Sequence, residues 1–242
     1  MLPYLQLLRL PTVFTAMADI VLGRLLLNDR TLEPYPAFFT ILASSCALYL
    51  SGMVFNDVFD VAQDSVERPQ RPIPSGRVSL RQAAILGVIL MLGGIGIAAT
   101  MSITMLFMAL ALAFMILAYD SFLKRTPLGP IAMGSCRFLN VMLGASASTG
   151  SLLKLFDLPQ LMVAAGLGVY IVGVTWFART EAKASHRGQL VGATLVLNAG
   201  LAGLAGLILR WPNQGDQLRS LLLLAIVAGS LNIRAANAIR LA

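Results

Sequence analysis

The feature that most limits how this chain can fold is a series of long apolar stretches separated by polar connections. A helix needs about 20 apolar residues to cross the hydrocarbon core of a bilayer. Eight stretches approach or exceed that length, and they cover residues 5–27, 36–58, 82–100, 103–119, 129–149, 158–177, 189–209 and 218–238. Hydrophobic residues make up 57% of the 242 residues and charged residues 12%, which excludes a water-soluble globule and a disordered chain. The sequence therefore predicts an all-helical, polytopic membrane bundle of about eight transmembrane helices, organised as a single domain over residues 1–242.

The net charge of +7 is spread unevenly over the connections between these stretches. The connections after the second, fourth and sixth stretches hold nine basic side chains, at Arg68, Arg71, Arg77, Arg81, Lys124, Arg125, Arg179, Lys183 and Arg187, whereas the other connections hold four. Because lysine and arginine mark cytoplasmic loops, we expect these connections and both termini to face the cytoplasm of a bacterial-type inner membrane. Basic residues confined to short loops indicate membrane orientation and anionic ligands, and not a nucleic-acid partner.

The end of the second apolar stretch is unusually rich in acidic side chains. Asn56, Asp60 and Asp64 recur every four residues, which would place them on one face of a helix, and Asp57 lies beside them. Like charges at this spacing repel one another, so a positive group is expected nearby. Carboxylate oxygens are the ligands that Mg²⁺ prefers. The segment therefore predicts a Mg²⁺ site made by these four residues.

Arginines follow the acids within the same connection, at Arg68, Arg71 and Arg77. Their guanidinium forks match phosphate oxygens, so acids for a metal and arginines for phosphate together suggest a metal–diphosphate site. The alternative is a solvated helix end whose acids simply pair with the neighbouring arginines. Asp19 raises a similar choice, because an acid inside an apolar stretch either serves a functional site or bonds Arg24 or a neighbouring helix.

The acidic run, continued by Arg68 and by Arg71-Pro72-Ile73-Pro74-Ser75-Gly76, resembles the first aspartate-rich motif of the UbiA superfamily of intramembrane prenyltransferases. Weaker similarity lies in Arg9-Leu10-Pro11, in the segment from Tyr119 and Asp120 to Lys124 and Arg125, and in Arg137 with Asn140; the subgroup suggested is the EboC-like one. The resemblance implies a helical bundle that transfers a prenyl group from a prenyl diphosphate, held by Mg²⁺, to a small acceptor that is often aromatic.

The resemblance weakens after the sixth stretch, where the superfamily carries a second aspartate-rich motif. Residues 175–188 contain Glu181 as their one acid. By resemblance, Glu181 is a metal ligand, while Lys124, Arg125, Arg179 and Lys183 join Arg68 and Arg71 as diphosphate contacts. Two interpretations stay open: basic side chains replace the missing metal charge, or the protein is a weakly catalytic or non-catalytic lipid-binding or assembly protein. A transporter is a further alternative.

Overall fold

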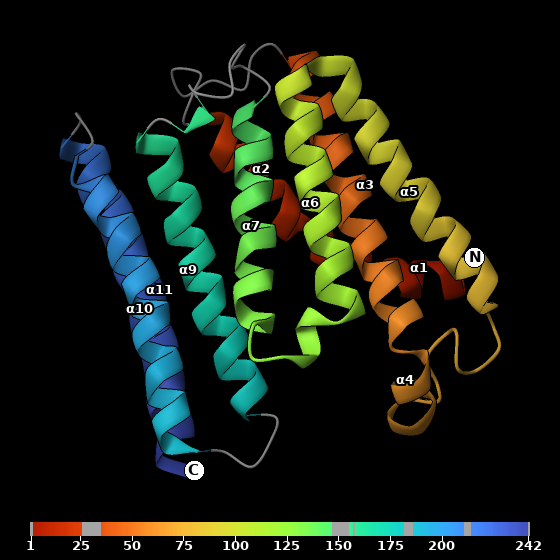
Figure 1. Cartoon of the computed structure of the whole chain (residues 1–242). Coiled ribbons are helices and arrows are strands. Elements are labelled where there is room, and N and C mark those ends of the chain that lie inside the picture. The colour runs from red at the N-terminus through yellow and green to blue at the C-terminus, as the bar shows by residue number, and fades with distance from the viewer. Residues whose placement is uncertain are drawn as a thin grey trace. The chain divides into compact units, whose positions relative to one another are not determined.

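The computed structural model describes residues 2–25, 35–146, 155–156, 158–181, 186–210 and 214–241. Within these ranges the regular structure is entirely helical (Figure 1). The helices are α1 (Leu2–Leu8), η1 (Leu10–Thr12), α2 (Val13–Leu25), α3 (Tyr35–Phe59), α4 (Val61–Glu67), α5 (Leu80–Met101), α6 (Ile103–Ser121), η2 (Leu123–Arg125), α7 (Gly129–Ser146), α9 (Leu158–Glu181), α10 (Arg187–Ile208) and α11 (Gln214–Leu241). The prediction of an all-helical chain is confirmed.

Seven segments of the described chain are long and apolar enough to cross a membrane. They are Leu2–Leu25, Tyr35–Phe59, Leu80–Met101, Ile103–Ser121, Gln160–Thr180, Arg187–Ile208 and Gly215–Leu241, and each coincides with a predicted stretch. The remaining predicted stretch, 129–149, forms α7, which is helical but not among the seven. The reason is polarity, because Arg137 and Asn140 lie within its 18 residues.

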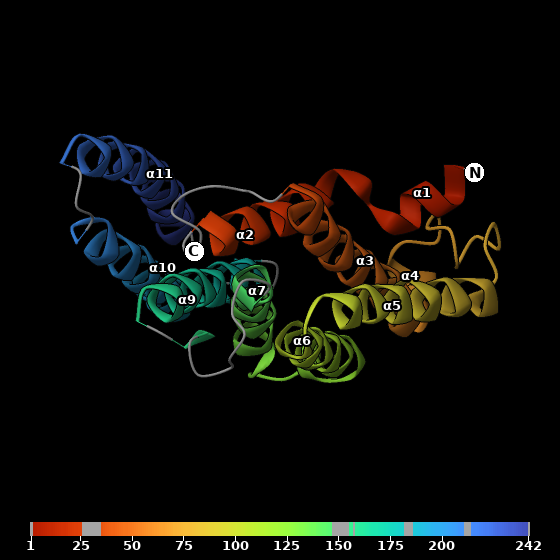
Figure 2. The same ribbon diagram turned by 90° about the horizontal axis from the view of Figure 1, so that it is seen from above.

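The chain divides into two compact units, and α7 contributes to both. The first unit comprises Met1–Leu123 and Leu139–Phe156, and the second comprises Lys124–Phe138 and Asp157–Ala242. In the first unit, α3 packs along α5 and also contacts α1, α2 and α6. Figures 1 and 2 show α3, α5 and α6 standing side by side. In the second unit, α10 packs against both α9 and α11.

Small residues let helices approach closely in the first unit, as is usual for helices in a membrane. Gly23 on α2 faces the backbone of α7 around Val141 and Gly144, and a Cβ on Gly144 would meet the backbone of Ile20. A buried polar cluster lies close by, because Asn140 donates to Asp19 (3.0 Å) and accepts from Ser45 (2.7 Å). Asp19 therefore bonds a neighbouring helix, which confirms the structural interpretation of this intramembrane acid.

The connection between α4 and α5 is anchored by apolar side chains. Ile73 and Val78 are buried against Leu7 and Val54 in one hydrophobic cluster. Ser79 then begins α5 with a capping box, in which its hydroxyl accepts from the backbone of Gln82 and the Gln82 side chain accepts from the backbone of Ser79. The arginines of this connection are thus carried on an ordered segment.

Candidate active site

The acidic motif does not form one uninterrupted helix. α3 ends at Phe59 and α4 begins at Val61, although the backbone N–H of Asp60 still bonds the carbonyl of Asn56 (3.1 Å) and that of Asp64 bonds Asp60 (2.8 Å). The side chains of Asn56 and Asp64 take different partners, described below. The prediction that Asn56, Asp60 and Asp64 act together therefore stays a prediction.

Asp57 and Asp64 are held by arginines. Both carboxylates are buried, with 5% and 4% of their side chains exposed. Arg71 joins them, since its Nη1 lies 3.1 Å from Asp57 Oδ1 and 2.5 Å from Asp64 Oδ2. Arg9, which has a left-handed backbone conformation between α1 and η1, also pairs with Asp57. Asp57 and Asp64 therefore pair with arginines, as the alternative interpretation of the acidic segment predicts.

This ion-pair network borders a cavity of about 240 Å³ at one end of the first unit. The cavity is lined by Gln6, Arg9, Asp57, Gln70, Arg71, Pro72 and Arg77. Arg77 is fixed there by hydrogen bonds to the side chains of Gln6 (3.0 Å) and Ser75 (3.0 Å). Three guanidinium groups against one carboxylate give the lining a net positive charge, which suits a phosphate-sized anion.

Asn56 contacts a carboxylate that the motif itself does not contain. Its Nδ2 donates to Oδ1 of Asp120 (2.9 Å), a residue 97% buried in the last turn of α6. Because a carboxylate accepts and an amide NH₂ donates, this bond fixes which way the amide of Asn56 is turned. The amide oxygen of Asn56 is therefore directed away from Asp120 Oδ1. The family resemblance includes the segment around Asp120, but the contact between Asp120 and Asn56 is not predicted from the sequence. A carboxylate at the end of an apolar helix is the signal that was available.

Chemically, the oxygen donors around Asn56 fit Mg²⁺ better than the arginine-paired acids do. Asn56 and Asp120 are in contact, and Asp60 follows Asn56 by one helical turn. Amide and carboxylate oxygens are hard ligands that suit Mg²⁺, which usually keeps only one or two carboxylates and takes other oxygens from substrate phosphates and water. Within the described residues, no three His, Cys, Asp or Glu side chains gather as metal ligands, so this fit requires the amide of Asn56.

The other predicted site residues are distributed over both units. Arg68 is exposed at the end of α4, and Lys124 and Arg125 belong to η2. Arg179, on α9, donates from Nη1 to the carbonyl of Thr126 (2.8 Å). Lys183 and the side chain of Glu181 lie outside the described residues, so their predicted roles stay predictions.

Helices of membrane-spanning length and an acidic motif bordered by arginines define a class of intramembrane helical proteins with a polar, charged end. A sequence model of the UbiA prenyltransferase family matches residues 16–239. The chain therefore belongs to the UbiA prenyltransferase family, and it is an integral membrane protein. The predicted family resemblance is confirmed.

A curated relative, digeranylgeranylglyceryl phosphate synthase of Saccharolobus solfataricus, is 31% identical over 145 residues, which are 60% of this chain and 51% of the relative. The chain spans about half the length of the curated relatives it matches first. Among solved structures, the apo UbiA homologue from Aeropyrum pernix K1 aligns with a TM-score of 0.73 at 17% identity, over 96% of this chain and 92% of that chain. A UbiA homologue from Archaeoglobus fulgidus bound to DMAPP and Mg²⁺ aligns with a TM-score of 0.71 at 15% identity, over 96% and 87%. These alignments establish a UbiA-like fold.

Proposed function

We propose that this chain is a Mg²⁺-dependent prenyltransferase, acting as a single domain over residues 1–242, that moves a prenyl group from a prenyl diphosphate to a lipid-precursor acceptor. The observation that carries the proposal is the hydrogen bond between Asn56 and the buried carboxylate of Asp120. Asp60 follows Asn56 by one helical turn. Family membership supports the reaction class. The name of the curated relatives supports an acceptor that contains glyceryl phosphate, and an aromatic acceptor is the second candidate.

In this proposal the oxygens of Asn56 and Asp60 hold Mg²⁺, with Glu181 as a further ligand, and Asp120 orients the amide of Asn56. When bound, Mg²⁺ would neutralise negative charge on the diphosphate. Asp57 and Asp64, which we included in the predicted metal set, instead position Arg9 and Arg71 through their ion pairs. This assignment divides the acids of the motif between metal binding and arginine placement.

The guanidinium groups of Arg9, Arg71 and Arg77 would bind the diphosphate of the donor. As the bond between the prenyl carbon and the diphosphate oxygen breaks, negative charge grows on the leaving group, and fixed cationic donors stabilise it. An oxygen or carbon nucleophile of the acceptor then forms the new bond to the prenyl carbon. Arg68, Lys124, Arg125 and Lys183 are further proposed diphosphate contacts, and the apolar helices exclude water from the reacting carbon.

The proposal is tested with purified protein in nanodiscs, incubated with Mg²⁺, a prenyl diphosphate (DMAPP, GPP or geranylgeranyl diphosphate) and either an isoprenyl glyceryl phosphate or an aromatic acceptor. Diphosphate release and the mass of the prenylated product are measured. We expect Mg²⁺-dependent product that is lost in Asp60→Ala and Asn56→Ala. The matched control is Glu67→Ala, an exposed acid of the same segment, and it should retain activity. Activity that survives Asp60→Ala would disprove the metal assignment, and wild-type protein without product would favour a non-catalytic lipid-binding role.

We also propose that the connection bearing Arg68 to Arg81 faces the cytoplasm of a bacterial-type inner membrane. The excess of basic residues in alternate connections supports this orientation. A membrane-impermeant thiol reagent applied to Ser75→Cys should label inside-out vesicles and not right-side-out vesicles, and the reverse pattern would contradict the orientation.

A further inference from the structure

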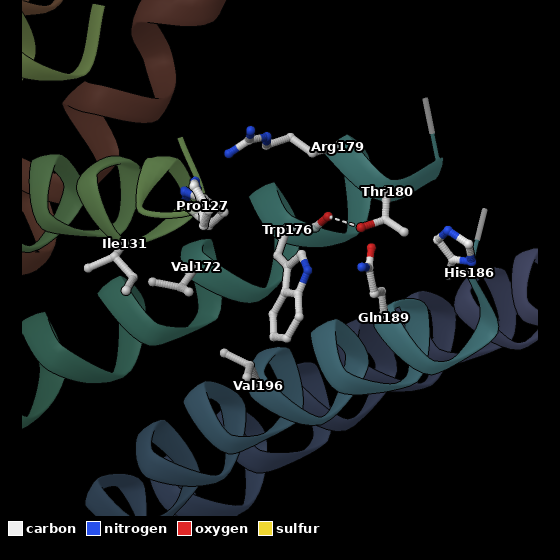
Figure 3. A pocket seen from close by; sticks show the side chains of 10 residues that line it. Pro127, Ile131, Val172, Trp176, Arg179, Thr180, His186, Gln189 and Val196 are labelled. Carbon is white, nitrogen blue, oxygen red and sulfur yellow. Dashed lines mark hydrogen bonds between the residues drawn. The ribbon is translucent and has the colours of Figure 1, made fainter. Parts of the chain in front are cut away.

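A cavity of about 800 Å³ lies among α7, α9 and α10 of the second unit (Figure 3). None of the first-motif acids lines it, and none of its described lining residues is acidic. The function proposed above therefore makes no use of this cavity. Arg179, which lines it, is predicted from the sequence to contact diphosphate. The shape and chemistry of the cavity need a separate explanation.

The lining changes from apolar to polar along the helices. On α9, Val172, Trp176 and Arg179 are spaced four and three residues apart, so they share one face and span about 10 Å along the axis. On α10, Val196 lies two turns beyond Gln189. Figure 3 shows Arg179 and Thr180 on one side of Trp176 and Val196 on the other. The cavity is thus amphipathic along its length.

The polar end of the cavity coincides with the end of two membrane-spanning helices. The span on α9 ends at Thr180, and the span on α10 begins at Arg187, directly after His186. Trp176 lies one turn inside that boundary, at the depth where tryptophan is enriched in membrane proteins. By the length and composition of these spans, the cavity is expected at the border between water and hydrocarbon, where lipid headgroups meet their chains.

The polar end also carries positive charge in a fixed orientation. Arg179 donates from Nη1 to the Thr126 carbonyl (2.8 Å), which holds the side chain while the guanidinium has further N–H donors for an anion. The exposed His186 precedes α10, a 22-residue helix whose N-terminus favours negative charge at the same end.

We propose that this cavity binds a bilayer phospholipid with a net anionic phosphate headgroup. The phosphate contacts Arg179, His186 and Gln189, and the first part of a hydrocarbon chain lies along Trp176, Val172 and Val196. The positive charge of Arg179 favours an anionic headgroup. The apolar part of the lining favours a lipid, which has a hydrocarbon chain, over a free anion. Arg179 is thereby assigned to lipid binding in place of the predicted diphosphate contact.

The test uses full-length protein with Trp211→Phe, which leaves Trp176 as the single tryptophan. The protein is reconstituted with phosphatidylcholine and a small mole fraction of chain-brominated phosphatidylglycerol or chain-brominated phosphatidylcholine, and quenching of Trp176 fluorescence is titrated. We expect the anionic lipid to quench at about tenfold lower mole fraction, the ratio that one charge-assisted hydrogen bond supports. Arg179→Gln should abolish the preference. The matched control is Arg187→Gln, an exposed arginine that does not line the cavity, and it should retain the preference.

The proposal would be overturned if both lipids quench the parent protein equally. It would also be overturned if Arg179→Gln and Arg187→Gln lose the preference for the anionic lipid to the same extent. Inorganic phosphate is added in a separate arm. Relief of quenching by millimolar phosphate would identify a free-anion site and also overturn it, whereas insensitivity supports a lipid. Circular dichroism and elution volume establish that each variant is folded. Because quenching needs no substrate, failure of this test is independent of whether the chain transfers prenyl groups.

Discussion

Replacement of Arg71 by alanine should destabilise the protein more than any other loss of a single arginine from the acidic segment. Arg71 contacts both Asp57 and Asp64, and 21% of its side chain is exposed, against 5% and 4% for the two carboxylates. After the substitution Asp57 retains Arg9, whereas Asp64 loses its arginine. Removal of one partner from a buried ion pair typically costs about 3–5 kcal/mol. Since Arg71 is itself partly exposed, we expect a loss of about 3 kcal/mol.

The assay is denaturant-induced unfolding of the purified protein in mixed micelles, followed by circular dichroism. Arg9→Ala should cost less than Arg71→Ala, because a third of the Arg9 side chain is exposed and Asp57 retains Arg71. Arg81→Ala, an exposed position at the start of α5, is the matched control and should change stability by less than about 0.5 kcal/mol.

A second variant separates the unpaired charge from the lost packing. In Arg71→Ala combined with Asp64→Asn, Asp57 retains Arg9 and the carboxylate of residue 64 is gone, so part of the stability should return. If the Arg71→Ala variant is as stable as the Arg81→Ala variant, the inference that Arg71 compensates a buried charge on Asp64 is refuted. A double variant that is less stable than Arg71→Ala alone would also refute it.

Three further changes test other contacts. Asp120→Ala should weaken the binding of Mn²⁺, used as a paramagnetic substitute for Mg²⁺, about 10- to 100-fold in electron paramagnetic resonance, because Asn56 loses the carboxylate that orients it. Unchanged affinity would contradict the assignment. Asp120→Asn should lose less affinity than Asp120→Ala, because its side-chain oxygen can still accept from Asn56. Gly144→Leu should lower the free energy of unfolding by about 1–3 kcal/mol or more, because the space beside α2 is filled by backbone, and an unaltered free energy of unfolding would show that α2 and α7 can separate at little cost. Asn198→Leu removes the reciprocal amide pair with Asn232 (2.9 Å) and should cost about 0.6 kcal/mol in the same unfolding assay; a gain in stability would mean that the pair serves a purpose other than stability.

The positions of the helices could be predicted because membrane crossing imposes a minimum apolar length. The predicted stretch 36–58 differs by one residue at each end from α3, Tyr35–Phe59. The first stretch was predicted as one helix, whereas the structure interrupts it at Arg9, whose left-handed conformation precedes the 3₁₀ turn at Leu10–Thr12. Pro11 offered a local signal for a break, since it lacks a backbone N–H, but the placement of Arg9 beside Asp57 is a tertiary effect.

The candidate site was harder to predict, because its contacts join residues far apart in sequence. Arg9 meets Asp57 across 48 residues, and Asn56 meets Asp120 across 64. Helical spacing groups residues only within one continuous helix, so it grouped Asn56 with Asp64 and could not anticipate that each finds a partner outside the helix. The alternative interpretation, in which the acids pair with neighbouring arginines, holds for Asp57 and Asp64, which both contact Arg71.

A division of labour among the acids follows from what each one contacts. A carboxylate that already accepts hydrogen bonds from two guanidinium groups is a poor metal ligand, because the metal would have to displace them. The same carboxylate is well suited to hold those guanidinium groups in place, and fixed cations stabilise a developing negative charge without reorganising. Asp57, through Arg9 and Arg71, meets this description. Asn56 does not, since its amide is oriented by Asp120 with the oxygen directed elsewhere. One short acidic segment can therefore serve both purposes only if neighbouring positions point to different partners, and the adjacent residues Asn56 and Asp57 on α3 do so.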